Sequence, residues 1–150
     1  LAAFVELHIE QGAVLDEAGI DIGVVEGIVG IRWWDITVEG MANHAGTTPM
    51  HLRHDAGYVA GAIARFARDL ALEMGGNQVA TVGSIKLRPD LINVVPNRAI
   101  VTVDLRNTDE ALLQQAEHRM GAFVAATAPG RVVRSVVIGR SPMVRHRRIG

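Results

Sequence analysis

The chain lacks cysteine, has few aromatic residues and contains no long apolar run, and these absences exclude several classes of protein. Without cysteine, neither disulfide bonds nor thiolate metal sites can form. The composition suits a reducing compartment, so we expect a cytoplasmic protein. No apolar run approaches the roughly 20 residues of a membrane span. A net charge of -1 provides no strong field for nucleic acid. We therefore predict a soluble domain whose partners include neither nucleic acid nor a membrane.

The apolar residues that are present are sufficient for a core. The chain has 150 residues, of which 49% are hydrophobic and 21% charged. A chain of this length buries roughly 70% of its unfolded surface. Leu1 is not a methionine, and the apolar start reads as a strand without its sheet partners. We expect residues 1–25 to be the remnant of another domain, residues 26–139 to form one compact unit, and residues 140–150 to form a basic tail.

Hydrophobic periodicity predicts the order strand, helix, strand, strand, helix, strand. In the first strand Trp34, Ile36 and Val38 alternate with polar residues. Asn107 and Glu110 resemble a capping box at the start of the second helix. The remaining elements are a helix over residues 59–74, strands at about 78–87 and 98–106, a helix stripe over 113–127 and a strand over 131–138. This order predicts an α+β fold, the ferredoxin-like βαββαβ arrangement, with two helices on one face of a four-stranded antiparallel sheet.

The run from Glu6 to Gly12 predicts one wall of a metal site. Because side chains alternate along a strand, Glu6, His8 and Glu10 share one face of a short predicted strand. Gln11 follows at its carboxyl end, where α/β folds place their ligands. From the residues alone, such a histidine is more often an ordinary core or surface residue than a metal ligand.

Two later residues have both a plain and a functional interpretation. Arg106 shares a strand face with Asp104, away from the predicted helices, so it is either a solvated or paired residue or a clamp for a carboxylate. His44 precedes Gly46-Thr-Thr-Pro49, which favours a tight exposed turn, so a loop histidine that caps the turn is the plain interpretation.

Four motifs in order carry a family resemblance. They are E-L-H-I-E-Q-G at 6–12, A-N-H-A-G-T-T-P-M at 42–50, N-V-V-P at 93–96 and V-D-L-R at 103–106. Together they resemble the amidohydrolase family of N-carbamoyl-L-amino-acid hydrolases, allantoate amidohydrolases and β-ureidopropionases. The resemblance covers about residues 4–127. It implies that residues 1–25 belong to a metal-binding catalytic domain, whereas residues 26–139 form a lid and dimerisation domain.

The resemblance also implies roles for single residues. His8 matches a metal ligand of the family, and Arg106 matches the arginine that binds the substrate's carboxylate. His44 matches a histidine that contacts the scissile carbonyl, so it is the expected catalytic residue and would stabilise an oxyanion. Asn93 and Gln11 are expected to contact the substrate as well. Glu6 and Glu10 match no catalytic position of the family.

The implied reaction is metal-assisted hydrolysis of the carbamoyl or ureido C–N bond of an N-carbamoyl-L-amino acid or allantoate. The family implies two divalent ions, of zinc, manganese, cobalt or nickel, which would activate water and polarise the carbonyl. Only His8 of the expected ligands is found in the chain, so we expect no complete metal site and no activity from these 150 residues alone. After Ile138 the sequence also departs from the family pattern.

The resemblance implies a homodimer in which the lid domains pair along a sheet edge. The predicted strand at 78–87 has few features that protect an edge, so we expect it to pair with a second copy. Two other functions remain open. The segment would otherwise be the lid of a related dipeptidase or deacylase, or a dimerisation module without enzymatic activity.

Overall fold

The chain consists of two units that divide between Glu26 and Gly27, and the second unit extends to Arg145. The computed structural model describes residues 4–127, 133–141 and 144–145, the last two ranges by their backbone alone. The elements in chain order are α1 (Val14–Ala18), β1 (Gly27–Ile28), β2 (Gly30–Glu39), β3 (Asn43–His44), the 3₁₀ turn η1 (Met50–Leu52), α2 (Ala56–Met74), β4 (Val79–Arg88), β5 (Val94–Val95), β6 (Arg98–Asn107), α3 (Glu110–Thr127), β7 (Val133–Ser141) and β8 (Val144–Arg145).

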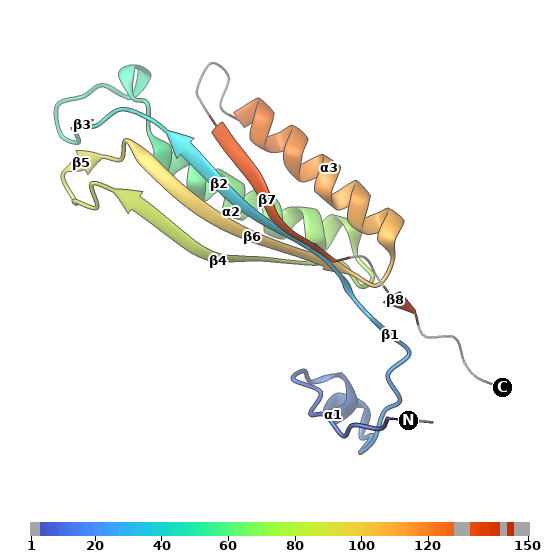
Figure 1. Cartoon of the computed structure of the whole chain (residues 1–150). Helices are drawn as coiled ribbons and strands as arrows, with labels where there is room; N and C mark the ends of the chain where they lie inside the picture. The colour runs from blue at the N-terminus through green and yellow to red at the C-terminus, as the bar shows by residue number, and fades with distance from the viewer. Residues whose placement is uncertain (1–3, 128–132, 142–143, 146–150) are drawn as a thin grey trace. The chain divides into compact units, whose positions relative to one another are not determined.

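The second unit has the predicted ferredoxin-like architecture. Its main sheet has the strand order β4-β6-β2-β7, and all three neighbouring pairs are antiparallel. Both long helices, α2 and α3, cover one face of this sheet (Figure 1), and the described part of the second unit has no other α-helix that could cover the opposite face. The prediction of an α+β fold with two helices on one face is therefore confirmed.

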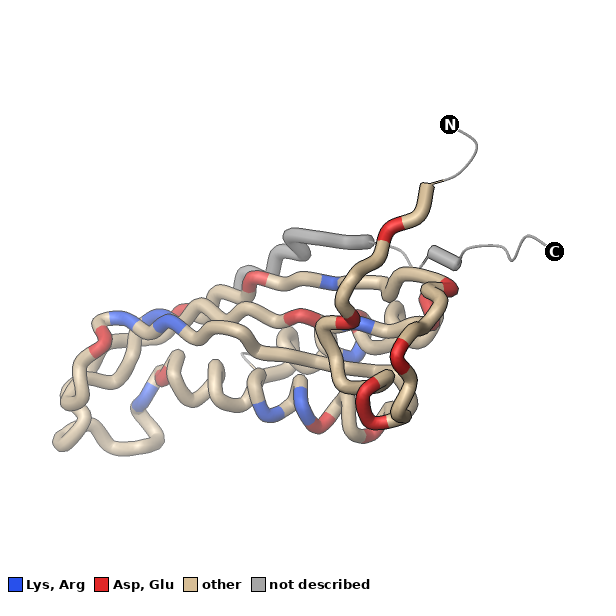
Figure 2. The backbone as a smooth tube through the Cα atoms, turned by 90° about the horizontal axis from the view of Figure 1, so that it is seen from below, with Lys and Arg blue, Asp and Glu red and all other residues tan. Residues whose placement is uncertain are grey.

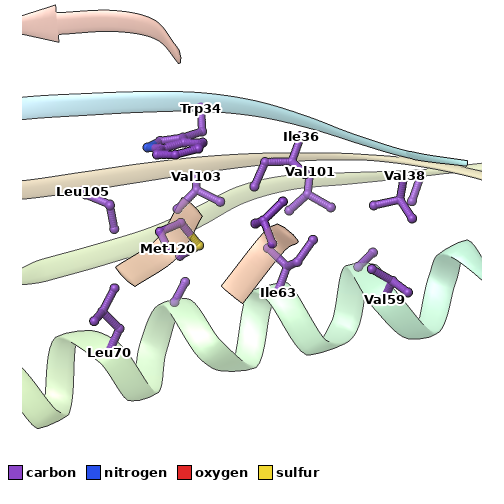
Figure 3. Close-up of a cluster of buried hydrophobic side chains, with 14 of the residues drawn as sticks. Trp34, Ile36, Val38, Val59, Ile63, Leu70, Val101, Val103, Leu105 and Met120 are labelled. Carbon is purple, nitrogen blue, oxygen red and sulfur yellow. The ribbon is translucent and has the colours of Figure 1, made fainter. Parts of the chain in front are cut away.

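Alternation along the central strands builds the core. In β2 Trp34, Ile36 and Val38 are buried as predicted, and in β6 the buried residues are Ala99, Val101, Val103 and Leu105. These side chains meet Val59, Ile63 and Leu70 of α2 and Met120 of α3 (Figure 3). Because the faces of the sheet follow from a two-residue period, Asp104 and Arg106 lie on the open face.

The residue that caps the start of α3 differs from the predicted one. The Asp109 carboxylate accepts hydrogen bonds from the amides of Ala111 at 2.8 Å and Leu112 at 3.0 Å, so Asp109 caps the helix. Asn107 instead accepts from the Asp109 amide at 2.9 Å and donates to Gln78 at 2.9 Å. The predicted cap was wrong because Asn107 and Asp109, two positions apart, are both suitable cap residues, and only Asp109 lies directly before the helix.

The end of the second unit also differs from the predicted limit at 139. The β7 strand pairs with β2 as far as Ser141, and β8 pairs with β1. The compact unit therefore includes residues that we predicted to belong to a basic tail. The rest of that predicted tail, residues 142–143 and 146–150, lies outside the described residues.

The first unit differs in character from the second. Residues 4–10 form no strand, which corrects the predicted alternation of Glu6, His8 and Glu10, because no described segment pairs with them. The α1 helix buries none of its residues. Residues 1–26 contain six carboxylates and no lysine or arginine, and Figure 2 shows only acidic colouring along their described part. No helix among the described residues is long and apolar enough to cross a membrane.

Candidate substrate-binding site

His44 and Asn93 are brought together by a pair of very short strands. Strand β3 pairs with β5, so His44 lies opposite Val94. The Ala45 amide donates to the Asn93 carbonyl at 2.9 Å, which continues the pairing by one residue. Two of the predicted substrate contacts, 49 residues apart in sequence, therefore lie on neighbouring backbone segments at one end of the sheet.

The turn after His44 is held by its own hydrogen bonds. The His44 carbonyl accepts from the Thr48 amide at 3.1 Å and from the Thr48 hydroxyl at 2.7 Å. The Arg53 guanidinium donates to the Ala45 carbonyl at 2.6 Å and to the Thr48 carbonyl at 3.0 Å. Sequence reasoning missed Arg53, because nothing in its spacing shows that it bonds to carbonyl groups of the turn. These bonds fix the backbone from which the His44 side chain projects.

Gly40 allows the turn to approach the start of α2. A Cβ at this position would lie 2.1 Å from the His54 carbonyl oxygen, so no larger residue fits without movement of the backbone. The neighbouring Met41 amide donates to that same carbonyl at 2.8 Å. Asp55 then caps α2 by accepting from the Tyr58 amide at 3.0 Å.

The side chains of His44 and Asn93 are both exposed. His44 Nδ1 accepts a hydrogen bond from the Gly46 amide at 3.0 Å, and Nε2 faces no partner among the described residues. The Asn93 side-chain amide likewise makes no hydrogen bond within the described part of the chain. Both groups are thus available to a polar ligand.

Arg106 lies on the open face of the sheet and is held by Asp104. Its Nε bonds to both carboxylate oxygens at 3.1 and 3.0 Å, and Nη2 bonds to Oδ2 at 2.7 Å. These hydrogen bonds raise the pKa of Arg106, against a smaller lowering by burial, so the guanidinium stays charged. The side chain is 42% exposed, and Nη1 has no partner among the described residues. A second carboxylate can therefore approach the outer edge of the guanidinium.

A shallow hollow of about 270 Å³ borders Asp104 on the open face. It lies where two strands depart from regular pairing: β4 has one extra residue at Gly83, and the pairing of β7 shifts between Trp33 and Trp34. Trp33 lines the hollow and is 44% exposed. The Asp104–Arg106 pair therefore has an apolar surface beside it.

A buried polar network anchors the same end of the sheet. Arg32 is 5% exposed and bonds to Glu117 at 2.8 Å and to Glu110. Burial lowers the pKa of Arg32, but the hydrogen bonds and charges of both glutamates raise it overall, so the arginine stays charged. Gln78 donates to the Arg106 carbonyl at 3.1 Å. Sequence reasoning missed this network, since its partners lie far apart along the chain.

Arg106 and His44 of one chain do not lie together. Arg98 opposes Glu39 at the end of β6 near the His44 turn, whereas Arg106 opposes Ile31 at the other end. Eight residues of strand separate these two arginines, which is about 26 Å at the usual rise per residue. A small substrate cannot span that distance, so a single copy cannot offer both residues to it.

For the two predicted site residues of the first unit, Gln11 and His8, the structure describes only the backbone conformation and contacts with residues near in sequence. Gln11 is exposed and has a positive φ of 56°. His8 Nδ1 lies 2.6 Å from the Ile9 carbonyl, so Nδ1 carries the proton and the Nε2 lone pair is available. Glu10 accepts from the Val14 and Leu15 amides and caps α1.

A complete metal centre does not fit the described part of the chain. His8 is the one expected ligand present, and no three His, Asp or Glu side chains gather among the described residues.

The fold defines a class of small α+β domain, in which two helices cover one face of a four-stranded antiparallel sheet. Residues 27–132 match the family described as the peptidase dimerisation domain, and the chain belongs to that family. It is 47% identical over 127 residues to an allantoate amidohydrolase of Escherichia coli, which covers 82% of this chain and 31% of the relative. It is 43% identical over 128 residues to an N-carbamoyl-L-amino-acid amidohydrolase of Paenarthrobacter aurescens, again 31% of the relative.

Solved structures agree with this assignment. A hydantoinase/carbamoylase family amidase from Burkholderia multivorans superposes with a TM-score of 0.88 at 36% identity. The match covers 92% of this chain and 34% of the amidase. The chain therefore spans about a third of the length of the relatives it matches.

Proposed function

We propose that this chain is part of a metal-dependent hydrolase that cleaves the ureido or carbamoyl C–N bond of N-carbamoyl-L-amino acids or allantoate. The observation that carries the proposal is the His44 turn, which presents an imidazole and the Asn93 amide from a backbone fixed by the chain itself. The relatives named for these substrates support the substrate class.

In this proposal each residue has a distinct role. Arg106 binds the substrate carboxylate through the edge that Asp104 leaves open. His44 donates a hydrogen bond to the carbonyl oxygen as negative charge develops on it. Asn93 and Gln11 supply further polar contacts, and His8 contributes one metal ligand.

Two divalent ions would activate water and polarise the carbonyl in the whole enzyme. Because His8 is the one candidate ligand, the remaining ligands must come from outside this chain. Residues 4–9 expose Phe4, Val5, Leu7 and Ile9, which is the surface of a segment that packs against further protein.

The active site then requires two copies of the chain. The distance along β6 separates Arg106 from His44 within one copy, so one copy supplies the carboxylate clamp and its partner supplies His44 and Asn93. Strand β4 lies at an edge of the sheet, has no proline between Val79 and Arg88, and exposes Val79 and Ile85. We infer that β4 pairs with β4 of the second copy around a two-fold axis.

Mixing two inactive variants tests this arrangement. In an intact enzyme that carries this segment, Arg106→Ala and His44→Ala are each expected to be inactive by themselves. A mixed dimer contains one site that has both the normal arginine and the normal histidine. After subunit exchange at equal amounts, half of the dimers are mixed, so about one quarter of the normal activity should return.

An affinity tag on one variant only controls for exchange, because recovery of the untagged variant with the tagged one reports whether mixed dimers are present. If mixed dimers form and activity stays at the level of the separate variants, the site lies within one copy and the shared arrangement is wrong. If neither variant reduces the hydrolysis of N-carbamoyl amino acids and allantoate, the proposed substrate contacts are wrong.

A further inference from the structure

The hydrogen bond between Gly46 and His44 determines which ring nitrogen carries the proton. The Gly46 amide lies 3.0 Å from His44 Nδ1. A backbone N–H group only donates, so Nδ1 accepts through its lone pair and carries no proton. The neutral ring therefore has its proton on Nε2, the nitrogen that faces away from the turn.

We propose that the Gly46 amide is a positioning group that selects the Nε2–H form of His44, so that His44 meets the substrate as a hydrogen-bond donor and not as a base. This inference rests on the proposed function, because a donor at Nε2 is useful only if a developing oxyanion lies in front of it. It adds that the backbone of the same turn decides the chemical role of the ring.

The Gly46 amide is held in place from both sides of the turn. Before it, the Ala45 amide is fixed by the Asn93 carbonyl and the Ala45 carbonyl by Arg53. After it, Thr48 bonds twice to the His44 carbonyl. Because the backbone on each side has its own partners, the donor that faces Nδ1 is pre-organised before any substrate arrives.

Glycine at position 46 also leaves space for the ring. A Cβ there would lie 3.3 Å from His44 Cε1 and 3.5 Å from Nδ1, the first of which is closer than an ordinary contact. A side chain would push the imidazole away from the amide and lengthen the hydrogen bond. The absence of a side chain at Gly46 and the hydrogen bond from its backbone N–H group thus both favour the same position of the ring.

His8 provides an opposite case within the chain. Its Nδ1 lies 2.6 Å from the Ile9 carbonyl oxygen, which only accepts, so Nδ1 is the protonated nitrogen. In both residues a neighbouring backbone group sets the tautomer. His8 is left with a lone pair on Nε2, and His44 is left with an N–H group.

Nitrogen NMR of the chain tests the tautomer without any activity measurement. In the ¹⁵N-labelled chain, at a pH where the rings are neutral, long-range proton–nitrogen correlations distinguish protonated from unprotonated ring nitrogens. The His44 signals are assigned by their loss in His44→Ala. We expect Nε2 to be protonated and Nδ1 unprotonated, and we expect the Gly46 amide to exchange about fivefold faster in His44→Ala.

His51, which is exposed and makes no side-chain hydrogen bond among the described residues, is the internal reference. A proton on Nδ1 of His44, or the same mixture of forms as His51, would overturn the proposal. These outcomes leave the proposed substrate class unaffected, so the two inferences fail separately.

A pair of substitutions in an intact enzyme tests the consequence for catalysis. Asparagine offers Gly46 an acceptor near the Nδ1 position but no donor near Nε2, whereas glutamine carries an N–H donor near Nε2 and is not a base. We expect His44→Asn to lower kcat by about 100-fold to 1000-fold with little change in KM, the effect of losing one oxyanion donor. His44→Gln should retain at least about tenfold more activity than His44→Asn. Equal loss in both variants would show that the ring acts as a base and would overturn the donor role.

Discussion

The surroundings of His8 and His44 show how differently the two units of this chain hold the side chains that we propose to be functional. His8 lies in an exposed segment, and its ring bonds to the carbonyl of the next residue. His44 lies in a turn whose Ala45 amide donates to the Asn93 carbonyl and whose carbonyl groups accept hydrogen bonds from Thr48 and Arg53. Each histidine lies in a short sequence motif, but only the turn around His44 is held by hydrogen bonds with residues elsewhere in this chain. The proposed site residue whose backbone is held by several hydrogen bonds is therefore the one whose partners lie within this chain.

The largest expected effect tests whether this chain, with His8 as its one expected metal ligand, is sufficient for chemistry. We expect the isolated 150-residue chain to bind no dinuclear metal centre and to hydrolyse neither N-carbamoyl amino acids nor allantoate, because a dinuclear site needs more ligands than His8. Metal analysis after dialysis and a release assay for ammonia or the free amino acid measure this. Two ions bound per chain, or turnover that survives purification, would contradict the expectation that this chain lacks a complete metal site.

The next effect concerns the stability of the second unit. Arg32→Ala should lower the free energy of unfolding by about 3 kcal/mol, because it removes one partner of a buried ion pair. Arg65→Ala is the matched control, since Arg65 is 82% exposed and its pair with Asp69 should contribute at most about 0.5 kcal/mol. Urea unfolding of the isolated chain, followed by the fluorescence of Trp33 and Trp34, measures both. Equal losses would show that burial of Arg32 has no special consequence.

The smallest effect concerns Arg106, which we propose to bind the substrate's carboxylate. In an intact enzyme that carries this segment, Arg106→Lys should lower kcat/KM by about tenfold to a hundredfold, since a single ammonium replaces the planar fork. Arg98→Lys is the control, because Arg98 lies on the same strand and is half exposed beside Glu39. Steady-state kinetics with an N-carbamoyl amino acid compares them. The clamp would be excluded if both variants kept the same kcat/KM as the unchanged enzyme.

The fold could be predicted from the sequence because its elements are long and periodic. Trp34, Ile36 and Val38 determine the face of β2, and the stripe of Val59, Ile63 and Leu70 determines that of α2. The proposed pairing edge also follows from strand order, and β4 does lie at an edge. Such patterns depend only on residues that are near in sequence.

The site could be predicted only as a set of residues. The β3–β5 pairing joins two strands of two residues each, which is too short for any periodic signal, yet it places His44 beside Asn93. The same alternation that buries Trp34 puts Arg32 on the helix face, but its glutamate partners lie 78 and 85 residues away. The bond from Gly46 to the ring depends on backbone geometry, which the residue types do not specify. Contacts of this kind became visible only in the folded chain.

Because of the extra residue at Gly83, strand β4 should tolerate the loss of one residue, whereas the neighbouring strand β6 should not. Before the bulge Ala80 and Val82 pack toward the core, and after it Leu87 does, so the inward positions change from even to odd numbers. Loss of one residue near the bulge would restore regular pairing and leave every remaining side chain on its present face. Strand β6 pairs with β2 without a bulge, so the same loss there would move Asp104 or Arg106 to the opposite face. Natural variation in chain length should therefore be found at the rim of this sheet and be absent from its centre.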